Sequence, residues 1–120
     1  MSELTIDYQT TAEGDVLHLR GRATYREAHE LRDKLFEAIA ARPSGRLILE
    51  LSAVEIMDTA ALAVLVEGIL STRRKDTELF FCTPSKSVRE IFALAGLEEA
   101  LTRCCGCLDD ALKASAPAAA

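Results

Sequence analysis

The stretch LILELSAVEIMDTAALAVLVEGIL, residues 47–70, decides how this chain folds. The short, mostly apolar run at residues 46–51 is typical of a strand that is covered on both faces, and we expect it to be central in a sheet. Residues 59–73 lack strand-like alternation and contain few β-branched residues, which predicts a helix with Asp58 near its N-cap. Asp58 and Thr59 therefore stand at a turn between two segments that are both predicted to be buried.

The segments before this stretch predict a hairpin followed by a helix. Apolar residues alternate with polar ones at residues 4–8 and 16–19, on either side of Glu13-Gly14-Asp15, as in two strands joined by a turn. From Thr24 the apolar residues follow helical spacing, and this helix is predicted to stop near residues 42–45. Its inward residues are predicted to be Ala28, Leu31, Leu35, Ala38 and Ile39.

The segments after it predict one further strand and two further helices. Residues 78–82 have the composition of a buried strand, and residues 85–94 that of a helix which Gly96 closes. Residues 97–107 leave room for another short strand, and residues 108–114 have the pattern of a final short helix. The inward positions of the 85–94 helix are predicted to be Val88, Ile91, Phe92 and Ala95.

Strands that alternate with helices predict a single α/β domain. We expect a mixed, mostly parallel sheet of four to five strands, with helices packed mainly on one face. A chain of 120 residues is long enough for one hydrophobic core. The domain is predicted to span residues 1–113, and the alanine-rich tail at residues 114–120 is expected to be disordered.

Charge and hydropathy argue against nucleic acid and membrane as partners. The 14 Lys and Arg residues are outnumbered by 19 Asp and Glu, and the net charge of −5 repels phosphate backbones and anionic headgroups. No apolar run reaches the roughly 18 residues that a membrane span needs, and the first 15 residues do not resemble a signal peptide. We therefore expect a cytoplasmic protein without membrane insertion.

Motifs of enzymes and metal sites are lacking in this sequence. There is no glycine-rich phosphate loop, no G-x-S-x-G and no H-E-x-x-H, so neither catalysis by this chain nor a cofactor is expected. His18 and His29 are interpreted as a strand-face and a solvated helix-face histidine. The cysteines are spaced poorly for a zinc site, so we expect reduced thiols and no metal. They are Cys82, Cys104, Cys105 and Cys107.

The Asp58-Thr59 pair has two interpretations. In the simpler one, Asp58 caps the helix, Thr59 occupies its first position, and neither has a further role. In the other, the small and apolar residues that follow leave a shallow apolar surface near the helix N-terminus, which a partner covers. A hydroxyl beside such a surface suits a switch, because phosphorylation adds nearly two negative charges to a desolvated contact.

The same stretch carries a family resemblance. The segment LILELSAVEIMDTAALAVLVEGI, followed by ELFFCTPSKSVREIFALAGLEEAL, resembles the STAS family, which is shared by bacterial anti-sigma factor antagonists and the cytosolic tails of sulfate transporters. The resemblance covers about residues 4–113, and residues 51–59 match the family's strand-to-helix motif. Further matching positions are Gly21, Pro84, Ser85, Val88, Phe92, Ala95, Gly96 and Leu97.

The resemblance implies a function through protein partners. In antagonists of this family, a serine or threonine after the Asp is phosphorylated by a partner that is both a serine-threonine kinase of the histidine-kinase-like ATPase type and an anti-sigma factor. Only the unphosphorylated antagonist binds that partner and frees the sigma factor. By position, Thr59 would be the phosphorylated residue. The implied partner-binding residues are Asp58, Thr59, Ala60, Ala61, Leu62, Ala63, Arg22 and Thr24.

Departures from the family pattern leave the partner open. Residues 58–63 read Asp-Thr-Ala-Ala-Leu-Ala where the family commonly has Asp-Ser-Ser-Gly-Leu-Gly, and Arg22 puts a basic residue into a loop that is acidic in many antagonists. The resemblance also fits a STAS subunit that binds the ATPase of a lipid-transport type ABC assembly and modulates it. A nucleotide-binding enzyme on this scaffold is the weakest alternative, and the apolar helix could instead serve a homodimer.

Overall fold

The computed structural model describes residues 3–12, 14–41, 45–101 and 104–105. In these residues one sheet has the strand order β1-β2-β3-β4-β5. The first two strands pair antiparallel and the other neighbours pair parallel, which confirms the mixed, mostly parallel sheet. The strands are β1 (Leu4–Thr10), β2 (Asp15–Ala23), β3 (Arg46–Met57), β4 (Glu78–Cys82) and β5 (Cys104–Cys105).

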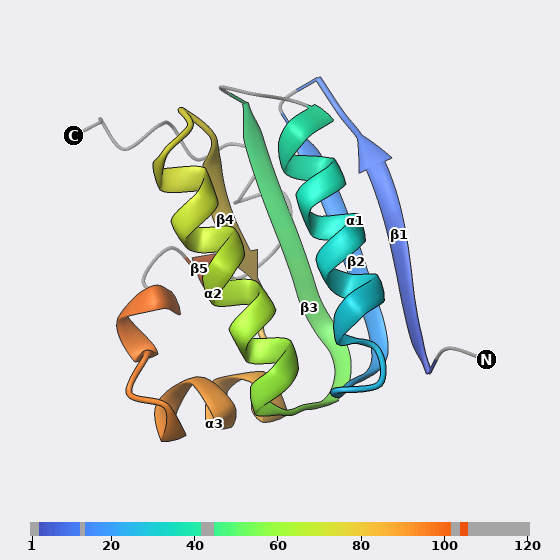
Figure 1. Cartoon of the computed structure of the whole chain (residues 1–120), viewed down its shortest axis with the longest axis vertical. Helices are drawn as coiled ribbons and strands as arrows, with labels where there is room; N and C mark the ends of the chain where they lie inside the picture. The colour runs from blue at the N-terminus through green and yellow to red at the C-terminus, as the bar shows by residue number, and fades with distance from the viewer. Residues whose placement is uncertain (1–2, 13, 42–44, 102–103, 106–120) are drawn as a thin grey trace.

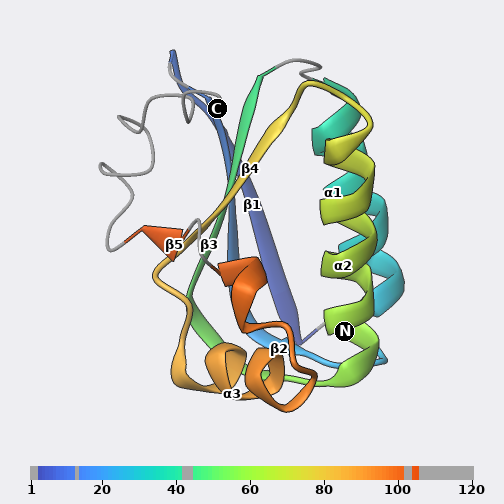
Figure 2. The same cartoon turned by 90° about the vertical axis from the view of Figure 1, so that its left-hand side faces the viewer.

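Two long helices cover one face of this sheet. Figure 1 shows α1 (Ala28–Ala41) and α2 (Thr59–Arg73) side by side across the strands, and Figure 2 shows both on the same side of the sheet. The shorter α3 (Lys86–Leu94) lies near the end of the sheet where α2 begins, and a 3-10 helix, η1 (Glu98–Leu101), follows it. This confirms the expected α/β domain with helices mainly on one face.

The sheet and the two helices enclose the core. Leu17, Leu49 and Phe81 point from neighbouring strands into the same cluster as Leu35 of α1 and Leu65 of α2. Each of these five side chains is at least 98% buried, because alternate residues of each strand face the helices. The helices pack closely at Gly68, where an added Cβ would lie 2.7 Å from a methyl carbon of Leu35.

The first helix begins later than expected. The pattern predicted a helix from Thr24, but α1 begins at Ala28, because residues 24–27 form a separate hydrogen-bonded turn before it. The backbone N–H of Thr24 donates to Glu27 Oε1 at 2.9 Å, and the Thr24 hydroxyl donates to the same oxygen at 2.7 Å. The backbone of Glu27 in turn donates to the Thr24 carbonyl at 2.9 Å.

The central strand is longer than expected. Residues 46–51 were predicted as a strand, and β3 continues to Met57 because its second half pairs with the end of β2, beyond register shifts next to Arg20 and Gly21. Val54 and Met57 on this extension are buried in the core. The predicted central position of the strand is confirmed, since β2 and β4 flank it.

The third helix agrees with its prediction except at one position. Ser85 is its N-cap, and Val88 and Phe92 are fully buried. Ala95 was expected to point inward, which is wrong: it is exposed, since the helix has already ended at Leu94. Gly96 follows with φ +71, the left-handed conformation that commonly terminates a helix.

The remaining predictions concern the C-terminal part of the chain. The short β5 pairs parallel with β4 and provides the additional strand for which the sequence left room. The helix predicted at residues 108–114 and the tail at 114–120 lie outside the described residues. No helix among the described residues is long and apolar enough to cross a membrane.

Candidate functional site

The candidate site lies at the edge of the sheet where β2 and β3 end. Ala23 and Met57 form the last pair between these parallel strands, so the residues that follow each strand emerge side by side. After β3 the chain passes through Asp58 directly into α2, and after β2 it passes through the Thr24–Glu27 turn into α1. Figure 1 shows both helix starts at this edge.

Asp58 connects the two segments. Its Oδ1 atom accepts a hydrogen bond from the backbone N–H of Ala61 at 3.0 Å, which caps α2, and its Oδ2 atom accepts one from the backbone N–H of Tyr25 at 2.8 Å. The backbone N–H of Asp58 donates to the carbonyl of Ala23 at 3.1 Å. Both carboxylate oxygens are thus engaged, and the predicted N-cap of α2 is confirmed.

Thr59 is the first residue of α2 and its side chain is exposed. The hydroxyl forms no hydrogen bond with any of the described residues, so a second protein can reach it. The first turn of α2 contains no acidic side chain, and its unpaired backbone N–H groups favour a negative group at this position. The carboxylate of Asp58 already occupies this environment as the N-cap of α2.

The eight predicted partner-binding residues are distributed between the surface and the core. Three residues of the predicted set have exposed side chains and three are half-buried. The exposed residues are Thr59, Ala63 and Arg22, and the half-buried residues are Asp58, Ala60 and Thr24.

Ala61 and Leu62 do not belong to the surface, which corrects their predicted role. They are 0% and 4% exposed because they lie on the side of α2 that packs against the sheet and α1. Their side chains are unavailable to a partner in this conformation, and they contribute to the site by anchoring the first turn of α2.

The expected apolar surface of α2 is displaced from the site. The exposed large apolar residue of this helix is Leu70, at 47%, which lies towards its C-terminal end. There Val66, Leu70 and Leu97 line a groove of about 540 Å³. Near Thr59 the exposed surface of the helix is limited to small side chains, so larger contacts must come from neighbouring segments.

Two apolar side chains near the site were missed by the sequence prediction. Tyr25 in the turn is 67% exposed, and Ile56 near the end of β3 is 40% exposed. Arg22 pairs with Ile56 in the register between β2 and β3. An aromatic residue within a turn that bonds Asp58 was not identifiable from spacing, because the contact joins residues 33 positions apart.

Glu27 was also missed, although the sequence carried a signal for it. Residues 24–27 read Thr-Tyr-Arg-Glu, which is the capping-box pattern. Hydrogen bonds from the backbone N–H and the hydroxyl of Thr24 hold the pKa of Glu27 below its usual value, with a smaller contribution from the charge of Arg22, while burial opposes the shift. Glu27 thus keeps the turn in the conformation that presents Tyr25 to Asp58.

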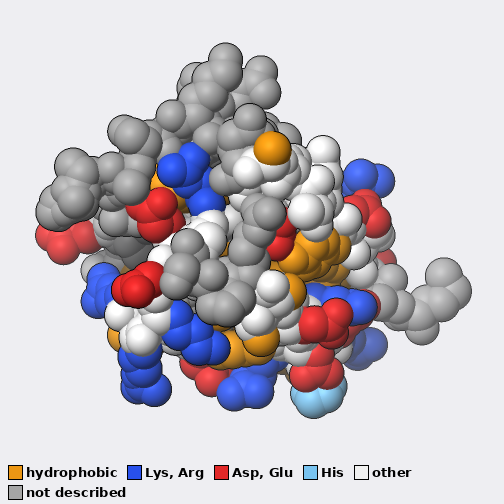
Figure 3. Space-filling model, turned by 90° about the horizontal axis from the view of Figure 1, so that it is seen from above, with side chains coloured by type: hydrophobic (Ala, Val, Ile, Leu, Met, Phe, Trp, Pro, Cys, Tyr) orange, Lys and Arg blue, Asp and Glu red, His pale blue; other side chains and the backbone are white. Residues whose placement is uncertain are grey.

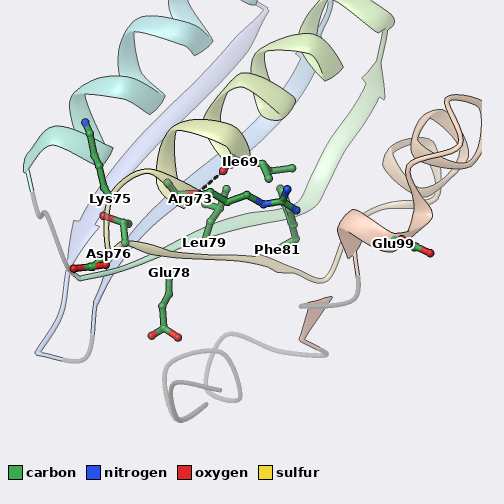
Figure 4. A pocket seen from close by; sticks show the side chains of 10 residues that line it. Ile69, Arg73, Lys75, Asp76, Glu78, Leu79, Phe81 and Glu99 are labelled. Atoms are coloured by element: carbon green, nitrogen blue, oxygen red, sulfur yellow. Dashed lines mark hydrogen bonds between the residues drawn. The ribbon is translucent and has the colours of Figure 1, made fainter. Parts of the chain in front are cut away.

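A separate cavity of about 440 Å³ lies at the other end of α2. Figure 4 shows Arg73, Lys75, Asp76 and Glu78 along its lining, with Lys75 and Glu78 pointing in different directions. Glu78 lies 3.6 Å from Arg46, so part of its charge is compensated outside the cavity. These charged side chains do not converge on one ligand atom.

The surroundings of the two histidines and of Cys82 are those of residues with a structural role. His18 on β2 lies 2.9 Å from Gln9 on β1, and His29 is solvated on α1 with Asp33 at 3.4 Å, as their interpretation predicted. Cys82 is a buried free thiol. Within the described part of the chain, no three His, Cys, Asp or Glu side chains are grouped as a metal site would require.

The described fold is similar to that of several solved structures. An anti-sigma factor antagonist from Mycobacterium paratuberculosis matches with a TM-score of 0.79 and 23% identity, covering 91% of each chain. The anti-sigma factor antagonist SpoIIAA in its unphosphorylated form matches with a TM-score of 0.71 and 18% identity, over 91% of this chain and 92% of SpoIIAA. A sulfate transporter family protein from Wolinella succinogenes matches with a TM-score of 0.70 and 23% identity, over 87% and 85%.

These identities establish similarity of fold, and the assignment to a family rests on the sequence. The family model of the STAS domain matches residues 6–111, which is most of the chain and includes both segments that meet at Asp58. The chain therefore belongs to the STAS domain family.

Proposed function

We propose that this protein is an anti-sigma factor antagonist that Thr59 phosphorylation switches off. In its unphosphorylated form it binds an anti-sigma factor that is also a serine-threonine kinase, of the histidine-kinase-like ATPase type. The kinase supplies the catalysis and this chain supplies the hydroxyl. Two of its structural neighbours, the protein from Mycobacterium paratuberculosis and SpoIIAA, are anti-sigma factor antagonists.

The proposal rests on the exposed hydroxyl of Thr59 next to a rigidly held carboxylate. Asp58 bonds the first turn of α2 through Oδ1 and the β2–α1 turn through Oδ2, so the position of the adjacent Thr59 is well defined. A kinase needs an accessible acceptor held in a reproducible geometry. A structural capping role alone requires Asp58 but gives no reason for an exposed hydroxyl beside it.

Phosphorylation would change the charge of this surface without unfolding it. A phosphate carries about −1.5 to −2 charges at neutral pH and is tolerated at a helix N-terminus. In a complex, the same group would have to be desolvated next to Asp58, and like charges disfavour that contact. Phosphorylation should therefore release the partner while the fold of the antagonist is retained.

Affinity capture from native lysate tests the proposal with Thr59→Ala and Thr59→Glu as baits. We expect the alanine bait to retain a protein with a histidine-kinase-like ATPase domain and the glutamate bait to lose it. Thr10→Glu on β1 is the matched control, because Thr10 is also an exposed threonine but lies at the other end of the hairpin. Equal capture by all three baits would contradict the switch.

Phosphorylation itself is tested with the captured protein and ATP. Mass spectrometry of the wild-type chain should locate the phosphate on Thr59, and Thr59→Ala should accept none. Phosphate on another residue would remove Thr59 from the proposal even if the partner were a kinase.

A transport-associated role is the second candidate. It is favoured by the similar fold of the sulfate transporter family protein from Wolinella succinogenes. In this case the chain would be a STAS subunit that binds and modulates the ATPase of an ABC assembly. An ABC ATPase on the alanine and glutamate baits alike would select this candidate over the antagonist.

A further inference from the structure

We propose that Tyr25, Arg22 and Arg26 form a docking surface for an acidic segment of the protein partner, with Tyr25 as its aromatic anchor. We call these three residues the turn surface. The inference rests on the proposed function and specifies the chemistry of the partner at the same site.

Tyr25 has the features of an interface anchor. Its side chain is 67% exposed, while its backbone N–H is bonded to Asp58 Oδ2 at 2.8 Å. Arg26 Nε donates to the Tyr25 hydroxyl at 3.3 Å, and the Arg26 guanidinium lies 5.8 Å from the ring centroid. Exposed aromatic residues that are held in place lose little entropy on binding, and tyrosine and arginine are enriched among the residues that dominate interface energies.

The charge of the turn surface is opposite to that of the whole chain. The net charge of the protein is −5, yet Arg22 and Arg26 are exposed and neither lies within 4.0 Å of a carboxylate of a described residue, although the charge of Arg22 also acts on Glu27. Arg20 nearby is 3.9 Å from Asp7, and Glu27 is buried with its carboxylate on Thr24. By contrast, Figure 3 shows basic and acidic side chains interspersed at the opposite end of the molecule.

This local charge favours an acidic protein segment as the occupant. Complementary charges raise the association rate and select among partners, and the effect weakens as salt screens it. The surrounding charge of −5 disfavours nucleic acid, because the acidic remainder of the chain would repel its backbone. A partner with a pocket for the ring of Tyr25 and carboxylates around that pocket would match both the exposed ring and the positive charge of Arg22 and Arg26.

The position of the turn surface connects it to the switch. Tyr25 is bonded to Asp58, which precedes Thr59, and Arg22 is paired with Ile56 two residues before Asp58. A phosphate on Thr59 carries about −1.5 to −2 charges and would therefore nearly cancel the charges of Arg22 and Arg26. Phosphorylation would convert a surface that attracts an acidic partner into one that does not.

Site-specific photo-crosslinking in lysate tests which molecule meets Tyr25. A benzophenone amino acid replaces Tyr25 in the Thr59→Ala chain, and the control carries it at Tyr8, which is 45% exposed on β1. We expect position 25 to crosslink an identified protein within a segment rich in Asp and Glu, at a yield at least fivefold above that of position 8. A second copy of this chain, a nucleic acid, a segment without acidic residues, or no crosslink above the control would overturn the proposal.

Affinity measurements with the crosslinked protein test the contributions of the side chains. Tyr25→Ala retains the backbone N–H that bonds Asp58, and it should weaken binding by at least tenfold, whereas Leu70→Ala at the other end of α2 should change it less than twofold. Arg22→Glu with Arg26→Glu should also weaken binding at least tenfold and reduce its salt dependence. Tyr25→Ala and the double arginine variant both within twofold of wild type would overturn the proposal.

The two proposals fail in different ways. A partner captured by Thr59→Ala and lost from Thr59→Glu, but not crosslinked from position 25, overturns the turn surface and leaves the switch. A partner crosslinked from position 25 equally in Thr59→Ala and Thr59→Glu supports the turn surface and overturns the switch.

Discussion

Removing the carboxylate of Asp58 should destabilise the protein by about 2 kcal/mol. The bond from Ala61 N–H to Oδ1 is an N-cap, whose loss typically costs about 1 kcal/mol. The bond from Tyr25 N–H to Oδ2 is charge-assisted, but Tyr25 is exposed and water can replace the carboxylate, so we assign it about 1 kcal/mol. For a chain of this length, Asp58→Ala should lower the melting temperature by about 8 °C.

Asp58→Asn separates the two contributions. Asparagine is a good N-cap and retains an oxygen for Ala61, but its amide group cannot accept a hydrogen bond from Tyr25. It should therefore lose about half of the effect, which thermal unfolding by circular dichroism and urea titration at pH 7 can measure. Ser85→Ala, which removes the longer 3.4 Å cap of α3, is the control and should cost about 0.5 kcal/mol. An Asp58→Ala variant within about 0.5 kcal/mol of wild type would refute the assignment of Asp58 as the connection between the two segments.

Five further variants, two of which serve as controls, test the fold. Gly21→Ala should lower the free energy of unfolding in urea by more than about 2 kcal/mol, because φ is +104 and the new Cβ would lie 2.3 Å from the Glu3 carbonyl oxygen. Gly96→Ala is the control: φ is +71 but the space is open, so it should lower the free energy of unfolding by about 1 kcal/mol. Phe92→Ala should lower the free energy of unfolding by about 3–5 kcal/mol, since the ring is fully buried and packs edge-to-face on Phe81 with 5.8 Å between the ring centroids. Leu94→Ala is the control and should stay within about 0.5 kcal/mol of wild type, because Leu94 is exposed. Glu27 has a lowered pKa in the folded state, so its stabilisation is complete above pH 4.5 and is lost as the pH falls through that value towards the folded pKa. Glu27→Gln should accordingly show a shallower loss of stability in acid than wild type, and parallel pH profiles would contradict the role of this carboxylate.

Local patterns were sufficient for much of the fold and for one residue of the site. Residues 59–73 and 78–82 form α2 and β4 with the predicted bounds, because long apolar runs and their flanking turn residues encode these elements locally. Asp58 was identified as the N-cap for the same reason, since a cap interacts with the next turn of its own helix.

Features that depend on distant segments were missed. The second half of β3 is a strand because it pairs with the end of β2. Tyr25 joins the site only through its bond to Asp58, and Arg22 comes beside Ile56 only through the pairing of β2 with β3. No spacing rule within a single segment contains these contacts.

The sequence by itself determined the alternation of strands and helices, the hairpin, the cap at Asp58 and the position of Thr59 as the first residue of the helix. The tertiary structure alone decided which side of the apolar helix α2 faces the core, and so buried Ala61 and Leu62 while leaving Thr59 and Ala63 exposed. The physical reason is that periodicity defines a surface only where polar residues mark one side of a helix. A helix that is apolar nearly all round is oriented by the sheet and by α1, which it packs against.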